Sequence, residues 1–224
     1  MATMEKSVQA WEVKLARNWS KSRVLDCLEK AQKAELVRFM NERYSERFFD
    51  PIRCLRSASG NSQGYGFAIM ALCCLLIETL ECYRKGLPSS NGGELGELEK
   101  SPDNQDAPAD YQLVRPFNET STSVFLAFFN DDLHKKYFPD VKGIDFYHKI
   151  RCGLLHQAQT KGKWRLVRTG KFWDADRMSI NRDEFSERLR ECFDGYLRQL
   201  DECAWDDPVW KSARKKIWWL TRTS

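Results

Sequence analysis

The chain has 224 residues, of which 42% are hydrophobic and 30% charged, an ordinary composition for a soluble globular protein. This length fits a single domain over residues 1–224, with enough apolar material for a sizeable core. The 36 Lys and Arg residues exceed the 32 Asp and Glu residues by only four, so the charge permits contact with a polyanion without requiring it. Charge alone therefore does not place the chain among nucleic-acid-binding proteins.

The eight cysteines form no Cys-x-x-Cys pair and no Cys and His spacing typical of a zinc site. Most of them lie beside leucine and phenylalanine in helical patterns, where a free thiol behaves as a small hydrophobe. The amino-terminal segment lacks a basic stretch followed by an apolar one, so no signal peptide is expected. We expect a reduced, cytoplasmic protein that uses no metal and no cofactor.

Apolar residues at helical spacing predict several helices in the first half of the chain. Residues 7–19 are expected to form a short amphipathic helix. A longer helix is expected over 24–48, ending before the proline of Asp50–Pro51. A turn-rich gap at 60–66 leads into an apolar helix, Tyr65 to Arg84. Its uninterrupted apolar run is well short of the roughly 20 residues that a bilayer span needs, so we expect a buried core helix and no membrane contact.

The next segment, 87–110, is rich in Ser, Gly, Asn, Asp and Glu and poor in apolar residues, which predicts a mobile loop within the domain. Helical spacing returns at 120–130 and again at about 145–160. Beyond these helices, 163–168 and 171–173 flank Thr169-Gly170, a pattern typical of a small β-hairpin.

Two helices are expected at the carboxyl end. One begins at Asn181, where Asn is a good N-cap and Glu184 follows three residues later. The other begins at Asp207-Pro208 and carries several tryptophans beside Arg214-Lys215-Lys216. These side chains could stack on bases or rest on an anionic surface, although packing against the protein is favoured. The sequence therefore predicts an all-α, up-and-down helical bundle with a small β-hairpin inserted after the helix at 145–160.

The helix expected at 145–160 contains Arg151 and His156 among apolar residues. The chain has only three histidines, and the other two, His134 and His148, lie in polar stretches where exposure is expected. Histidine is suited to take and give protons near neutral pH, and the planar arginine side chain is suited to grip phosphate oxygens. Both groups are needed to cleave RNA without a metal.

An arginine followed by four residues and a histidine, late in an all-helical chain, resembles the HEPN superfamily, many members of which are metal-independent endoribonucleases. The resemblance covers about a third of the chain, including Gln157 after His156. It implies that Arg151 and His156 are catalytic, that RNA is the substrate, and that two subunits build the site together. One departure is Cys152, because many nuclease members carry a polar residue there and a thiol is a weak hydrogen-bond donor.

Helix geometry also favours a dimer. Arg151 and His156 lie roughly 140° apart around an ideal helix, so one phosphate can reach both only across a groove between helices or at a local distortion. Gly153 costs up to about 1 kcal/mol against alanine in mid-helix and allows another backbone to approach. We expect Cys152 and Gly153 to contact the same helix of a second subunit, with another helix of the same chain as the alternative.

Other polar residues could support the site. Glu78 and Glu81 end the apolar helix, where an unpaired carboxylate is costly to bury, so one of them could pair with Arg151 and orient it. Tyr147 lies one turn before Arg151, where a core role is favoured over a hydrogen bond in the site, and Gln157 follows the histidine.

Three interpretations therefore follow from the sequence. The first is a homodimeric HEPN-like ribonuclease, acting as a toxin or antiphage defence effector and partnered by an antitoxin or regulatory protein. The second is a non-catalytic helical module that binds a protein or a nucleotide. The third is a surface-associating protein that uses its tryptophan-rich tail.

Overall fold

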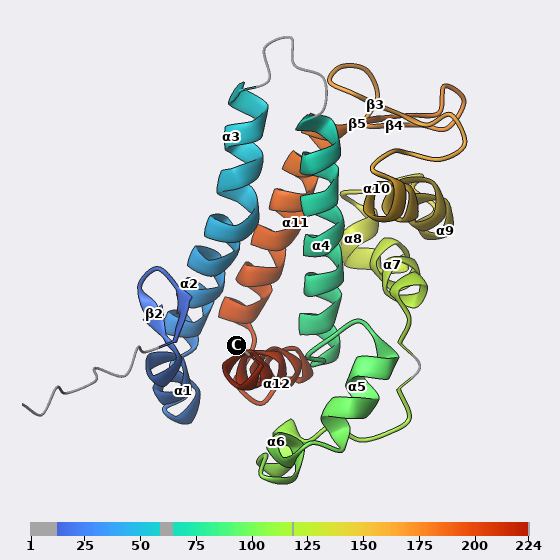
Figure 1. The fold of residues 1–224 in the computed structure, drawn as a ribbon. Helices are drawn as coiled ribbons and strands as arrows, with labels where there is room; N and C mark the ends of the chain where they lie inside the picture. The colour runs from blue at the N-terminus through green and yellow to red at the C-terminus, as the bar shows by residue number, and fades with distance from the viewer. Residues whose placement is uncertain (1–12, 59–64, 118, 224) are drawn as a thin grey trace, which may run out of the picture.

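The computed structural model describes residues 13–58, 65–117 and 119–223, and this part of the chain is mostly α-helical, as the sequence predicts. A continuous helical rod over residues 33–58, helix α4 (Tyr65–Lys85) and helix α11 (Arg182–Glu202) run side by side in Figure 1. Helix α12 (Pro208–Arg222) crosses beneath them and packs on α4. The apolar core lies between these helices and joins the aromatic cluster around the helix that carries Arg151 and His156, which we call the motif helix.

The helical rod corrects the helix predicted over 24–48 in two ways: it begins only after a turn at 30–32, and it does not break at Pro51. It comprises α2 (Lys33–Tyr44), the π-helical turn η1 (Ser45–Phe49) and α3 (Asp50–Ala58). A proline inside an α-helix removes one hydrogen bond and crowds the carbonyl four residues earlier. The wide turn directly before Pro51 already interrupts the α pattern, since Asp50 donates its N–H to the Ser45 carbonyl five residues back. The helix therefore continues to Ala58.

Helix α4 lies at the centre of the fold and follows the predicted bounds closely. By length and composition it is the one helix of the described ranges that could cross a membrane. It is instead contacted by α3, α7 (Ser121–Asn130), α11 and α12, and 56% of its most apolar stretch is buried inside the protein. A core helix passes the same test, and the packing of α4 fits that role.

The amino-terminal helix predicted at 7–19 is not found where the structure describes the chain. Residues 1–12 lie outside the described part, and the rest forms the antiparallel strands β1 (Lys14–Ala16) and β2 (Trp19–Ser20), followed by α1 (Lys21–Glu29). Leu15 and Trp19 are fully buried while Arg17 and Asn18 between them are exposed. Most of the turn predicted at 60–66 also lies outside the described residues.

The segment 87–110, expected as a mobile loop, contains short helices, so the part of that prediction that assigns it no regular structure is wrong. It holds α5 (Gly92–Glu99) and α6 (Pro102–Gln105), and the short 3₁₀ helix η2 (Ala109–Tyr111) begins at its end. Leu95 is fully buried, and the buried Asn104 side chain donates to the Glu99 and Leu113 carbonyls and accepts from the Leu113 N–H. Hydrogen bonds of this kind offset the low apolar content that the composition argument relied on.

The motif helix follows α7 (Ser121–Asn130) and α8 (Asp132–Lys135). It consists of α9 (Gly143–Asp145), the π-helical stretch η3 (Phe146–Arg151) and α10 (Cys152–Gln157), so it ends three residues before the predicted limit. Ala158 ends it in the left-handed conformation, at φ 52°. Phe146 is fully buried and packs on Phe125, Phe129 and Phe185. This aromatic packing fixes the motif helix against α7 and α11.

The predicted β-hairpin after the motif helix is wrong in its pairing. The strands are β3 (Arg165–Val167), β4 (Trp173–Asp174) and β5 (Ser179–Asn181), in the order β3-β5-β4. Strand β5 lies in the middle, parallel to β3 and antiparallel to β4. Residues 179–181 are all buried, which explains why they take the central place.

Helices α11 and α12 begin where the sequence predicts. The Asn181 side chain accepts from the Asp183 and Glu184 N–H groups, although Glu184 itself pairs with Arg188 instead of completing a capping box. Asp207 precedes Pro208 at the start of α12. The tryptophans of α12 are buried, as the packing interpretation expects.

Candidate functional site

Arg151 closes the π-helical stretch of the motif helix and reaches across to α4. Its Nε donates to Glu78 Oε1 at 3.0 Å, and its Nη2 lies 3.0 Å from the same oxygen. Both side chains are 14% exposed, so the pair is largely shielded from solvent. The Ser90 hydroxyl donates to the other carboxylate oxygen at 3.3 Å. Glu78 therefore orients the guanidinium, as predicted for one of the two glutamates.

The surroundings of Arg151 keep it charged. Burial works against the cation, but the Glu78 carboxylate more than offsets this effect, so the pKa of Arg151 is raised above its ordinary value. The guanidinium carbon lies 5.6 Å from the centre of the Tyr147 ring, close enough for a cation–π contact. Tyr147 is half-buried, and its ring also contacts the rings of Phe125 and His148, in agreement with a packing role.

Glu81 does not reach Arg151 and belongs to a different cluster. Its carboxylate is 3% exposed and lies 3.6 Å from Arg84 and 3.9 Å from His134. Arg84 also pairs with Asp131. Burial raises the pKa of Glu81 to about 7, against the lowering effect of Arg84 and Lys85. Of the two glutamates singled out in the sequence, only Glu78 supports the motif arginine.

His134 is buried, which corrects the expectation that it lies at the surface. Its ring is 4% exposed, packs 4.2 Å from the Phe128 ring centre, and places Nδ1 3.0 Å from the Phe128 carbonyl. Burial, aided by Arg84, lowers the pKa of His134 to about 4. The neutral ring donates from Nδ1 to the carbonyl, which leaves Nε2 to accept from Arg84 at 3.3 Å.

His156 is exposed near the end of the motif helix, as is Gln157. No hydrogen bond or ion pair of the His156 side chain is formed with the described residues. The π-helical stretch ends at Arg151, and the five steps on to His156 run through α-helix, so the two side chains remain roughly 140° apart. Within one chain the motif arginine and histidine are therefore not brought together.

Gly153 is approached closely by its own chain. A Cβ atom built there would lie 2.3 Å from the Gln159 carbonyl oxygen and 3.1 Å from the Lys161 amide nitrogen. The Lys161 N–H in turn donates to the Lys149 carbonyl at 2.8 Å, which fixes the returning chain on the helix. The returning chain leaves no room for a side chain at residue 153, which explains why a glycine is needed there. Contact with a second subunit or with another helix is not required to explain it. Cys152 beside it is half-buried.

A cation-rich segment that begins in the motif helix and continues beyond it was missed by the composition argument. Residues 149–177 contain eight Lys and Arg residues against two Asp residues, a net charge of +6, whereas the whole chain carries +4. A count by segment instead of over the chain would have found it. Most of these cations are exposed: Lys161, Lys163, Arg165, Arg168, Lys171 and Arg177.

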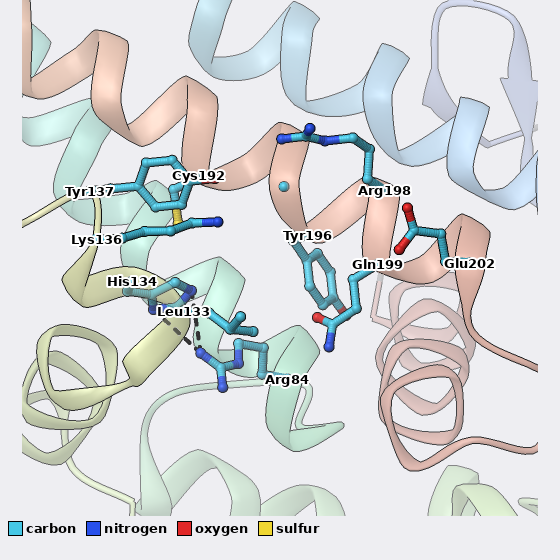
Figure 2. A pocket seen from close by; sticks show the side chains of 11 residues that line it. Arg84, Leu133, His134, Lys136, Tyr137, Cys192, Tyr196, Arg198, Gln199 and Glu202 are labelled. Carbon is cyan, nitrogen blue, oxygen red and sulfur yellow. Dashed lines mark hydrogen bonds between the residues drawn. The ribbon is translucent and has the colours of Figure 1, made fainter.

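A well-defined pocket lies elsewhere, between α4, α8 and α11 (Figure 2). It encloses about 300 Å³ and is lined by Arg84, His134, Lys136, Tyr196 and Arg198, among others. Neither Arg151 nor His156 lines it. Within the described ranges, no three His, Cys, Asp or Glu side chains are grouped as metal ligands would be.

Comparison of the chain with profiles of known protein families, with curated proteins and with solved structures finds no match. The function must therefore be argued from the geometry of the site.

Proposed function

We propose that this protein is a metal-independent endoribonuclease of the HEPN type that acts as a homodimer in the cytoplasm. Its helices would correspond to the up-and-down bundle of that superfamily. The observation that carries the proposal is the exposed imidazole of His156, which lies on the same helix as an arginine held by Glu78 and is followed in the chain by a cation-rich segment.

The cation-rich segment 161–177 supports RNA as the substrate. The cations of residues 161–177 lie on the chain that leaves the motif helix, and Lys161 is held against that helix by its hydrogen bond to Lys149. Sequence-independent binding of nucleic acid depends on such cations, because they replace the counterions around the phosphates. A strand bound along this segment would pass close to His156.

The reaction needs one base and one acid. The base takes the proton of the 2′-hydroxyl, whose oxygen attacks phosphorus, and the acid protonates the 5′-oxygen as its bond to phosphorus breaks. The products are a 2′,3′-cyclic phosphate and a 5′-hydroxyl. Two His156 side chains, one from each subunit, would supply the base and the acid, while Arg151 would stabilise the charge on the phosphorane.

A dimer is required because one chain supplies one motif histidine and holds it apart from Arg151. The motif helix offers apolar contacts for this purpose, since Ile144 and Leu155 are 40% and 39% exposed. Gly153 is covered by its own chain, so it is not free to contact a second subunit. In this proposal the dimer contact is therefore made by the exposed apolar side chains of the same helix, and not by Cys152 and Gly153 as the sequence suggested.

The test is cleavage of a labelled single-stranded RNA by purified protein. We expect His156→Ala and Arg151→Ala each to lose roughly 10²-fold or more in rate, as for a lost acid–base group or phosphate clamp. His148→Ala is the matched control, because His148 is also exposed on the motif helix and should leave cleavage unchanged. Equal cleavage by wild type and His156→Ala would refute the proposal.

The second candidate is a non-catalytic helical module that binds a protein or nucleotide. The burial of Arg151 favours it, because a guanidinium that is 14% exposed and paired with Glu78 can act as a structural clasp. In that case Arg151→Ala destabilises the fold, and no variant changes RNA cleavage above background. Under the first candidate, expression of the wild type slows cell growth, as a toxin or antiphage effector would. An antitoxin or regulatory partner would relieve this effect. The His156→Ala variant would not slow growth.

A further inference from the structure

The pocket between α4, α8 and α11 has no role in the function proposed above, yet its chemistry is specific. Its volume of about 300 Å³ lies at the lower end of the range for small-molecule sites, roughly 300 to 1,000 Å³. It is open at one side and has a buried floor formed by His134, Cys192 and Tyr196. A molecule in this pocket would contact side chains from three separate helices.

Three cationic side chains line the pocket from different sides (Figure 2). Arg84 comes from α4, Lys136 follows α8, and Arg198 comes from α11. Arg84 is paired with Asp131 and hydrogen-bonded to His134, as the dashed lines in Figure 2 show for the histidine. Lys136 and Arg198 form no ion pair with a carboxylate among the described residues. Both are exposed, and Figure 2 shows the Lys136 side chain extending over the pocket.

The α11 side of the pocket also carries groups that hydrogen-bond to neutral polar molecules. Gln199 and Glu202 follow Arg198 along α11, and in Figure 2 both lie on the far side of the pocket from Lys136. The Tyr196 hydroxyl is buried and has no hydrogen-bond partner in the described structure. A buried hydroxyl without a partner is costly, but this oxygen is enclosed and is not reached from the pocket, so Gln199 and Glu202 supply the hydrogen bonds on this side.

A glycine in α11 shapes this pocket. Gly195 lies in mid-helix, where a Cβ atom would come within 2.9 Å of the Tyr137 hydroxyl oxygen. Because Gly195 has no Cβ atom, Tyr137 can lie across α11. The Lys136 ammonium nitrogen lies 4.7 Å from the centre of the Tyr137 ring. This cation–π contact holds the lysine at the pocket without neutralising its charge.

We propose that this pocket binds a small sugar phosphate, that is, a phosphate ester whose organic part carries several hydroxyl groups. Lys136 and Arg198 bind the phosphate. Glu202 and Gln199 accept hydrogen bonds from the hydroxyl groups at the other end. The carboxylate of Glu202 also selects against a ligand that is anionic at both ends, because like charges repel. This binding is independent of RNA cleavage.

The experiment is isothermal titration calorimetry of the full chain with ribose 5-phosphate and glucose 6-phosphate. We expect saturable binding of at least one of them and none of ribose or glucose. Lys136→Ala and Arg198→Ala should each weaken that binding about tenfold, as expected for a lost hydrogen bond to a charged group. The matched control is Lys135→Ala, because Lys135 is an exposed neighbour that pairs with Asp132 and does not line the pocket.

A second variant separates the two ends of the ligand. Glu202→Gln removes one negative charge, so it should tighten the binding of inorganic phosphate while weakening the preference for the sugar phosphate over inorganic phosphate. The proposal is overturned if neither sugar phosphate binds, or if Lys135→Ala weakens binding as much as Lys136→Ala. It is also overturned if a short single-stranded RNA alone binds in a Lys136-dependent way, because the pocket would then be part of an RNA surface.

Discussion

Removal of either member of the Glu81–His134 pair is expected to reveal a pH dependence of stability that the pair conceals. The pKa of Glu81 is raised from its ordinary value of 4.5 to about 7, and that of His134 is lowered from 6.5 to about 4. Burial is the main cause of both changes, with Arg84 and Asp131 acting on both groups and Lys85 on Glu81. The folded and unfolded states therefore differ in the protonation of Glu81 from pH 4.5 to about 7, and in the protonation of His134 from pH about 4 to 6.5. These two pH ranges nearly coincide.

The two groups act in opposite directions. Between pH 4.5 and about 7 the folded protein keeps Glu81 protonated while the unfolded chain does not, so stability falls as pH rises. Between pH about 4 and 6.5 the unfolded chain protonates His134 while the folded protein does not, so stability rises with pH. At about 1.4 kcal/mol for one pKa unit, each effect reaches about 3 kcal/mol in total. The two effects largely cancel between pH 4.5 and 6.5.

Urea unfolding followed by circular dichroism tests this cancellation. From pH 4.5 to 6.5, Glu81→Gln should gain about 2 to 3 kcal/mol of stability relative to wild type, since only the histidine effect remains. His134→Gln should lose a similar amount over the same range. Asp132→Asn is the control, because its side chain is 96% exposed and it should follow wild type. If the difference between Glu81→Gln and wild type stays constant with pH, the reasoning fails.

Four further outcomes are expected. Gly153→Ala should cost about 1 to 3 kcal/mol of stability in thermal unfolding, because the added Cβ meets the Gln159 carbonyl, whereas Gly96→Ala in α5 should not. Glu78→Gln should lower RNA cleavage by misplacing Arg151, and cleavage at the wild-type rate would contradict that role. RNA cleavage should persist in EDTA and leave 2′,3′-cyclic phosphate ends, so loss with chelator and recovery with Mg²⁺ would argue for another mechanism. Light scattering should give a dimer at working concentration, and a monomer would remove the composite site.

Helices with clear periodicity or clear caps could be predicted from the sequence. Helix α4 has a long apolar run, and α11 and α12 begin at Asn181 and at Asp207–Pro208, where local hydrogen bonding or a fixed backbone angle sets the start. An ion pair between Arg151 and one of the two glutamates of α4 could also be predicted, because a carboxylate at the end of an apolar helix needs a partner; the sequence did not decide which of the two glutamates forms it.

Other features depend on contacts that no local pattern contains. The central place of β5 depends on burial of residues 179–181 beneath neighbouring elements, so the turn at Thr169-Gly170 alone was misleading. The burial of His134 depends on Glu81 and Arg84 from a helix about fifty residues earlier. The close approach at Gly153 comes from the chain that follows the motif, and sequence reasoning could identify the glycine but not its neighbour.

The π-helical stretch before Arg151 holds one residue more than a regular α-helix would place between the same two ends. An α-helix advances by about 100° per residue and the wider π turn advances by less, so the extra residue is absorbed with little net rotation. A chain shortened by one residue within 146–151 would therefore close into a regular α-helix, with Phe146 still in the aromatic core and residues 152–157 still facing in nearly the same direction. The rod formed by α2 and α3 carries a similar wide turn at 45–49. Single-residue deletions at these two places thus keep the orientation of the helix, whereas a deletion in the regular part of the same helices would turn one end against the other by about 100°.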